Sequence, residues 1–187
     1  MANKINYGLE QVHIAFVTNE TTPAWDTPVT LPGAVKFSPK PEGNEVKFYA
    51  DNTLYYTSTS NLGYSADLEV ALIPDEILAT MLGWRIDANG MLVEVADAAP
   101  KPFALMGQIE GDAKDRRFVY YYCIAARPSS ESSTSKDTVE PQTQTLTLTI
   151  LPIVAGGTKI VRGVMELGVT NSTAYNAFFD AVTLPAA

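Results

Sequence analysis

Hydrophobic and polar residues alternate most regularly between Gly63 and Ile73. One face of this stretch carries the apolar side chains of Tyr64, Ala66, Leu68, Val70 and Leu72. The opposite face carries Ser65, Asp67, Glu69 and Ala71. Because side chains along a β-strand point alternately to its two faces, this period of two predicts a half-buried strand. We expect the rest of the chain to be organised around it.

Further segments with apolar runs or alternation are predicted to form strands. They are Glu10–Val17, Val29–Phe37, Glu45–Ala50, Met91–Val95, Phe103–Ile109, Arg116–Ala126, Gln142–Leu151 and Lys159–Leu167. The Pro32-Gly33 pair interrupts the second of these, which is then either two short strands or a bulged edge strand. Ser38–Asn44 (SPKPEGN) and Gly156-Gly157 are predicted turns, and Asn89-Gly90 indicates a tight hairpin turn.

Two short helices are also predicted. Asp75 is expected to cap a helix that runs to Leu82 and ends at Gly83. Ser172 is expected to cap a final helix with an apolar stripe of Tyr175, Phe178, Phe179 and Val182.

No strand–helix–strand alternation points to a parallel sheet. We therefore predict a mainly β (α+β) fold, an antiparallel β-sandwich or partly closed barrel with a flanking short α-helix and a C-terminal helix. The length suits one domain over residues 1–187. Its predicted parts include an N-terminal arm (1–8), a long loop (127–141) and a C-terminal helix or arm (168–187).

Three segments have too few partners for their side chains within one such domain. The ribbon Thr53–Asn61 holds aromatic residues among Ser and Thr but has no apolar face. Phe118–Ala126 is apolar or aromatic on both faces, which predicts cover on both sides. The loop 127–141 is rich in Ser and Thr, and so long a loop in a compact domain usually has a task. We expect subunit contacts from these segments at Leu54, Tyr55, Tyr56, Tyr121, Ser130, Thr134 and Lys136.

The charge pattern argues against nucleic-acid binding. The formal net charge is −8, and residues 67–97 carry seven acids against one arginine. Direct binding needs a basic stripe that neutralises phosphates, and the chain has none. Charged residues make up 18% of the chain, against about 25% in ordinary domains. Extensive burial between subunits would require such a deficit, although a small crystallin-like monomer could show it too.

The chain is expected to be made and kept in a reducing cytoplasm, or in a particle assembled there. Its start, MANKINYGLEQ, lacks the apolar region of a signal peptide. No apolar run approaches the roughly 18 residues of a membrane span. The single cysteine, Cys123, has no partner for an internal disulfide and is expected to be a buried small hydrophobe.

No residue pattern supports catalysis, so we expect no enzyme, no cofactor and no metal site. His13 is the only histidine, which excludes a His-based triad or a two-His metal site within one chain. Asp67 and Glu69 share a face and could pair as glycosidase carboxylates, but a solvated strand face explains them more simply. Asp87–Gly90 lacks the spacing of a calcium loop, and Gly156–Lys159 lacks that of a phosphate-binding loop.

Two long runs of this sequence resemble the major tail (tail tube) proteins of long-tailed, non-contractile bacteriophages, the siphoviruses. The first is FYADNTLYYTSTSNLGYSADLEVALIPDE, residues 48–76. The second is DANGMLVEVADAAPKPFALMGQIEGDAKDRRFVYYYCIAARPSSESSTSKDTVEPQTQTLTLT, residues 87–149. The resemblance is co-linear from Lys4 to Pro152 and weakens beyond it.

This resemblance implies a structural virion protein with a β-sandwich-like core and a flanking helix. Six copies would join their sheets into a ring, and rings would stack into the tail tube through which viral DNA is ejected. The implied partners are further copies of the chain and the tape-measure, tail terminator and distal tail proteins. DNA would pass through the lumen without specific binding, and no membrane would be involved. The protein would be assembled in the host cytoplasm and reside in the phage tail.

A tube that conducts DNA must not hold it, so like charge on the lumen wall is favourable. We expect Asp67 and Glu69 to face the lumen, although an outer wall would also suit them.

Two alternatives to a phage tail tube stay open. One is a monomeric β-sandwich module that binds a glycan or a protein through Trp25, Trp84 and the Tyr55-Tyr56 pair. The other is the tube of a phage-derived bacterial particle, which differs in biological use but not in physics.

Overall fold

The computed structural model describes residues 8–112, 114–128 and 142–185. Within these ranges the chain is mainly β with two short α-helices, as the sequence predicts. The helical segments are α1 (Asp75–Leu82), α2 (Ser172–Asn176) and the 3-10 turn η1 (Ala177–Phe179). The strands are β1 (Gly8–Asn19), β2 (Ala24–Trp25), β3 (Val29–Thr30), β4 (Ala34–Glu42), β5 (Glu45–Ala50), β6 (Thr53–Thr59), β7 (Gly63–Val70), β8 (Arg85–Ile86), β9 (Leu92–Val93), β10 (Phe103–Glu110), β11 (Arg117–Ala125), β12 (Gln144–Ile150), β13 (Ile153–Ala155), β14 (Thr158–Ile160) and β15 (Arg162–Met165).

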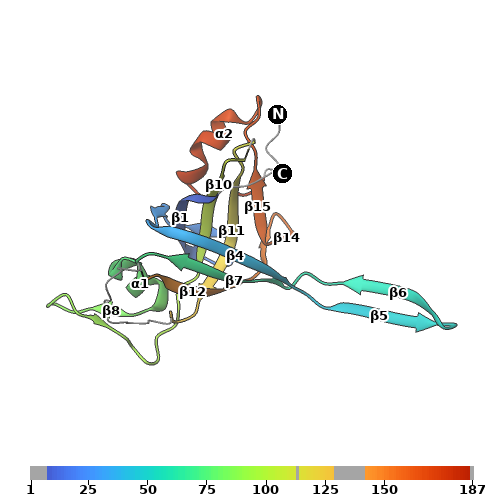
Figure 1. The fold of residues 1–187 in the computed structure, drawn as a ribbon, viewed down its shortest axis with the longest axis horizontal. Helices are drawn as coiled ribbons and strands as arrows, with labels where there is room; N and C mark the ends of the chain where they lie inside the picture. The colour runs from blue at the N-terminus through green and yellow to red at the C-terminus, as the bar shows by residue number, and fades with distance from the viewer. Residues whose placement is uncertain (1–7, 113, 129–141, 186–187) are drawn as a thin grey trace, which may run out of the picture.

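One large antiparallel sheet bends into two halves that face each other across the core (Figure 1). Its order is β2-β1-β10-β11-β12-β7-β4, with β3 beside β1 and β15 beside β11. The halves separate at β11, because β15 pairs with its first part and β12 with its last part. The sheet is not closed into a barrel, and the fold is β-sandwich-like. Three separate two-stranded ribbons, β5-β6, β8-β9 and β13-β14, extend from it.

The alternating strand lies in the middle of its half of the sheet, between β12 and β4. Ala66, Leu68 and Val70 are buried, as the period of two predicts. The prediction is wrong at its end, since β7 stops at Val70 and Leu72 is 68% exposed. Pro74 follows and precedes α1, so the chain leaves the sheet there and cannot continue the ladder.

The predicted turn over Ser38–Asn44 is also wrong, because β4 continues to Glu42. Pro39 and Pro41 pair in register with residues of β7. An edge strand tolerates proline where the missing N–H would point away from its neighbour. The two prolines therefore remove donors from the free edge of the sheet.

Several predicted boundaries change in detail. Val29–Phe37 proves to be two strands, β3 and the start of β4, which was one of its two alternatives. Lys159–Leu167 is split between β14 and β15, and Met91–Val95 shrinks to β9. Neither helix has the predicted cap, since Pro74 precedes α1 and Asn171 precedes α2 without a side-chain cap hydrogen bond. Gly83 ends α1 with a φ of 70°, as predicted.

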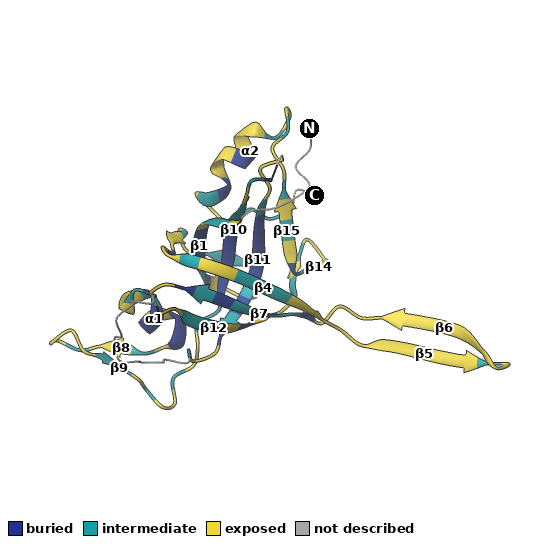
Figure 2. Ribbon diagram, viewed as in Figure 1, coloured by how far each residue is buried: buried dark blue, intermediate teal, exposed yellow. Residues whose placement is uncertain are grey.

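The C-terminal segment covers the outer face of β1, β10 and β11 (Figures 1 and 2). Phe178 is buried there in a second apolar cluster with Ala15, Ala104, Met106, Val119 and Tyr121. The main core on the other face includes Phe118, Tyr120, Cys123 and Ala125. The strand Phe118–Ala126 is thus covered on both sides, as predicted, but its second cover comes from its own chain.

The buried face of β7 provides a direct test of the core. Leu68→Ala should lower the free energy of unfolding by about 2–5 kcal/mol, because Leu68 is fully buried and its removal leaves a cavity. Leu72→Ala, in the same predicted strand but exposed, should change it by less than about 0.5 kcal/mol. Urea denaturation of both variants checks this, and equal losses would contradict the observed end of β7.

Candidate functional site

No group of three or more His, Cys, Asp or Glu among the described residues is placed to hold a metal ion. His13 Nδ1–H donates to the carbonyl of Gln11, so its Nε2 accepts from the Thr30 hydroxyl, and its ring stacks on Phe179. Burial raises the pKa of the Cys123 thiol, which keeps it protonated and unreactive. In the described part of the chain, no helix is long and apolar enough to cross a membrane.

The β5-β6 hairpin is the most prominent candidate for a functional surface. It projects from the body of the molecule as an isolated ribbon (Figure 1). Its two-residue turn, Asp51-Asn52, has φ values of 50° and 58°. Positive φ at both central residues is typical of a type I′ turn, whose twist matches that of the paired strands. Register shifts by one residue between Phe48 and Tyr49, which leaves Tyr55 in a bulge.

Large apolar side chains on this hairpin face solvent. Tyr55 is 73% exposed, and Leu54 and Tyr56 are exposed beside it. The same holds for Val46, Phe48 and Tyr49 on the partner strand, so the ribbon is exposed along almost all its length (Figure 2). Contiguous exposed apolar surface of this kind marks an interaction site. The sequence pointed to Leu54, Tyr55 and Tyr56, and it missed Phe48 and Tyr49 because Glu45–Ala50 has the pattern of an ordinary strand.

The other expected contact residues lie elsewhere. Tyr121 is 2% exposed, and its hydroxyl donates to the carbonyl of Thr183. It lies under the C-terminal segment, so it is not on the surface of this chain. Ser130, Thr134 and Lys136 fall outside the described residues.

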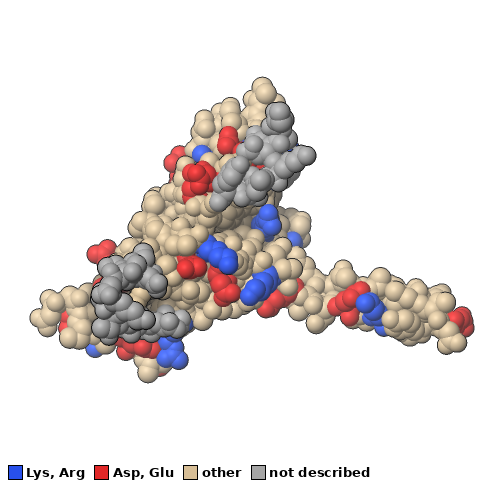
Figure 3. Space-filling model, in the orientation of Figure 1, with Lys and Arg blue, Asp and Glu red and all other residues tan. Residues whose placement is uncertain are grey.

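Asp67 and Glu69 lie on the outer face of the large sheet, opposite the core. Two lysines of β4 offset the negative charge of these acids, and only the strand register shows that they lie there. Lys40 Nζ lies 3.3 Å from Asp67 Oδ2, and Lys36 is the register partner of Glu69. Thr147 and Thr143 hydroxyls donate to Asp67 and Glu69 respectively. Basic and acidic side chains are therefore interspersed on this face (Figure 3), and it has little net charge.

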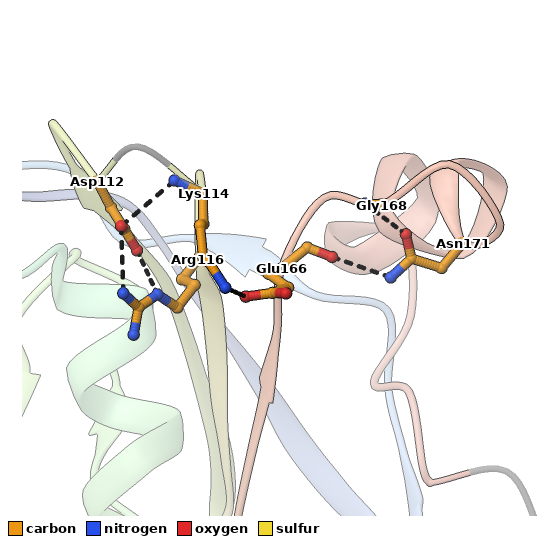
Figure 4. Close-up of polar contacts among 6 residues, drawn as sticks. All are labelled: Asp112, Lys114, Arg116, Glu166, Gly168 and Asn171. Carbon is orange, nitrogen blue, oxygen red and sulfur yellow. Dashed lines mark hydrogen bonds and ion pairs between the residues drawn. The ribbon is translucent and has the colours of Figure 1, made fainter. Parts of the chain in front are cut away.

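A polar network holds the turn between β10 and β11 (Figure 4). Asp112 Oδ2 lies 2.6 Å from Arg116 Nε in an ion pair outside hydrogen-bond geometry, while Oδ1 accepts from Arg116 Nη2 and from the Lys114 N–H. Burial raises the pKa of the Asp112 carboxyl, but the bonds from Arg116 and Lys114 outweigh it, so the pKa lies below its ordinary value. Lys114 Nζ also pairs with Glu166 at 2.8 Å, and Asn171 accepts from the Gly168 N–H and donates to the Glu166 carbonyl. The network joins the turn to the start of the C-terminal segment.

The same turn is tied to the C-terminal helix at a second point. The Arg117 guanidinium lies 4.0 Å from the centre of the Tyr175 ring and 4.7 Å from that of Phe179. The Tyr175 hydroxyl donates to the carbonyl of Asp115 at 2.6 Å. These contacts are structural, since they fix the segment that covers the second apolar cluster.

Comparisons with known proteins leave the family of this chain open. No family model matches it, and no curated protein matches it. Among solved structures, it is similar to a chain in the cryo-EM structure of the anti-feeding prophage (AFP) baseplate, 6-fold symmetrised. The identity is 8% and the TM-score 0.45, over 88% of this chain and 97% of that one. The score is too low to establish a shared fold.

The Asp112 network yields a prediction with a definite sign. Because its folded-state pKa is depressed, Asp112 stabilises the fold fully above the ordinary carboxyl pKa of 3.8 and loses this contribution as the pH falls below it. Asp112→Asn should therefore be less stable than the parent chain at pH 7, and the gap should narrow toward pH 3. Urea denaturation at both pH values measures it.

Glu166→Gln is the matched control, because its ion pair with Lys114 is exposed and contributes little. A gap between Asp112→Asn and the parent chain that stays constant with pH would contradict the assigned role of the carboxylate.

Proposed function

We propose that this chain is a structural subunit that assembles with copies of itself into the tail tube of a long-tailed, non-contractile phage. The observation that carries the proposal is the β5-β6 hairpin, which exposes large apolar side chains on an isolated ribbon. The sequence resemblance to tail tube proteins supplies the kind of assembly. In that assembly, rings of six stack into a conduit for DNA.

The hairpin explains why association would be favourable. A two-stranded ribbon is marginally stable by itself in water. Burial of its aromatic and aliphatic side chains against another copy would add about 25 cal/mol for each Å² of apolar surface removed from water. An open stack also needs two different surfaces that fit each other, since a self-complementary patch only closes a dimer. The hairpin is one such surface.

The large sheet restricts how neighbouring copies within a ring can meet. Pro39 and Pro41 leave the free edge of β4 without two donors, so a neighbour's strand cannot extend the sheet there by regular pairing. The opposite edge consists of the two-residue strands β2 and β3 beside β1. Contacts within a ring would therefore rest on side-chain packing or on short stretches of edge, and not on long strand pairing.

A monomeric glycan-binding module is less well supported. Such a module needs exposed aromatic platforms, whereas Trp25 and Trp84 pack against the two apolar clusters. The Trp25 indole N–H is further used in a bond to the carbonyl of Tyr121. Only the Tyr55-Tyr56 pair of the expected platforms is exposed. The tube of a phage-derived bacterial particle would use the same surfaces as a phage tail tube.

Assembly is tested with the purified chain at high concentration. Electron microscopy should show hollow tubes, and light scattering should show growth with concentration. Tyr49→Ser with Tyr55→Ser should fold normally but form no tubes at the concentration where the parent does, because two exposed apolar side chains of the hairpin are lost.

Leu72→Ser is the control, since Leu72 is equally exposed but lies on the body of the molecule. A parent chain that stays monomeric at millimolar concentration would overturn the proposal. Normal tubes from the double variant would show that the hairpin is not an assembly surface.

We further propose that the outer face of β7 lines the lumen. Because basic and acidic side chains nearly balance on this face, DNA would slide past it without being held. At physiological salt, the electrostatic effect of the face on DNA would reach only about 8–10 Å. Asp67→Lys with Glu69→Lys should keep the fold, because both side chains lie opposite the core, but should slow or stall DNA ejection by holding phosphate. Ejection assays on particles carrying both changes measure this. Unchanged ejection would place these residues on the outer wall.

A further inference from the structure

An open groove of about 410 Å³ lies where the two halves of the sheet separate. Its walls come from β1 and β4 and from the strands around β11, and its lining includes Leu9, Lys36, Phe37, Phe118, Tyr120 and Arg162. The groove exists because β15 and β12 pair with different parts of β11 and leave a gap on that side of the sheet. It therefore opens directly onto one end of the main core.

Aromatic rings form the floor of this groove. Phe37 stacks on Phe118 with ring centres 5.8 Å apart and an interplanar angle of 7°. Tyr120 meets the Phe37 and Phe118 rings edge-on, at 5.3 and 5.9 Å. Aromatic pairs favour such stacked and edge-to-face arrangements, so the floor suits another aromatic side chain.

Two basic residues, Arg162 and Lys36, are among those that line the groove. Arg162 lies 5.7 Å from the centre of the Tyr120 ring, and none of the ion pairs of the described residues includes it. Lys36 belongs to the rim, because it is the register partner of Glu69 on the outer face of the sheet. The groove thus combines an apolar aromatic floor with the positive charge of Arg162 on one wall.

The turn of the β5-β6 hairpin has the complementary chemistry. Asp51 lies at its tip without an ion pair among the described residues, whereas Lys47 and Glu45 lower on the ribbon pair with each other at 3.0 Å. Exposed Tyr49 and Tyr55 flank the tip. We propose that the groove receives the hairpin turn of a second copy of the chain, with aromatic side chains on its floor and Asp51 beside Arg162. This inference rests on the proposed self-assembly and names the second of its two surfaces.

The other cavities fit this occupant less well. A second cavity of about 450 Å³ is lined by Trp25 and Tyr122 but carries the Glu20 carboxylate, which would repel Asp51. A third, beside α1, has its basic residue Arg127 paired with Glu94 at 2.8 Å. The hairpin cannot fill the groove of its own chain, because it projects away from the body (Figure 1). Charge complementarity therefore favours the groove between the sheet halves as the binding site. The hairpin that fills it must come from a different copy.

Disulfide cross-linking between two variants tests the contact. The native Cys123 is fully buried, so an introduced cysteine is the only exposed thiol. Asp51→Cys and Arg162→Cys chains are mixed at the concentration where tubes form and are oxidised. We expect a covalent dimer that contains one chain of each kind, because the hairpin of one copy meets the groove of another. Glu20→Cys, in the second cavity, is the control and should give no such product with Asp51→Cys.

A charge exchange gives an independent readout. Arg162→Glu should raise the concentration needed for assembly about tenfold or more, as expected when a like charge replaces one member of an interfacial pair. Adding Asp51→Lys to this variant should restore assembly. Circular dichroism on each variant shows that its fold is intact, and failure of rescue by folded chains would overturn the inference.

The outcomes separate this inference from the proposed function. Tubes without the Asp51–Arg162 cross-link would support self-assembly and overturn the groove as the receptor of the hairpin. A cross-link from Asp51→Cys to Glu20→Cys in its place would assign the hairpin to the second cavity. Neither tubes nor cross-links would overturn both proposals.

Discussion

Packing of the β7 and β12 faces against β1, β10 and β11 is the interaction on which the rest of the structure depends. Leu68, Leu146 and Leu148 from one half are fully buried with Phe103 and Leu105 from the other. Because side chains on a strand alternate, burial of these residues fixes which side chains of β7 and β12 face outward. The polar outer face of β7 follows from this burial.

The β5-β6 hairpin does not bury its apolar side chains in this way. Along most of the described chain, large apolar residues on strands lie in one of the two clusters, but on the hairpin they face water. Segments that depart from the usual burial of large apolar side chains are commonly functional. Here the exposed ribbon and the open end of the core lie on one molecule, and the charge at the tip of the first is opposite to that on the walls of the second. Contact with a second copy would cover the exposed ribbon and fill the open end of the core.

Local patterns predicted those elements whose residues alternate between core and solvent, such as β7, β10 and β12. They failed where tertiary position decides, as at Pro39 and Pro41, which look like turn residues but lie on an edge strand. The second cover of β11 was predicted without its source, because nothing local links Tyr121 to Phe178. Lys36 and Lys40 beside the acids of β7, and the groove itself, depend on register between distant segments and have no local signal. The turn at Asp51-Asn52 did have one, since both residues tolerate positive φ.

The central claim is that the hairpin completes its packing on another copy. Hydrogen exchange read out by mass spectrometry tests it most directly, with amides of residues 45–59 followed in the dispersed chain and in the assembled tube. We expect fast exchange of these amides in the dispersed chain and strong protection in the tube, while amides of β7 are protected in both. Equally fast exchange of the hairpin amides in both states would contradict it.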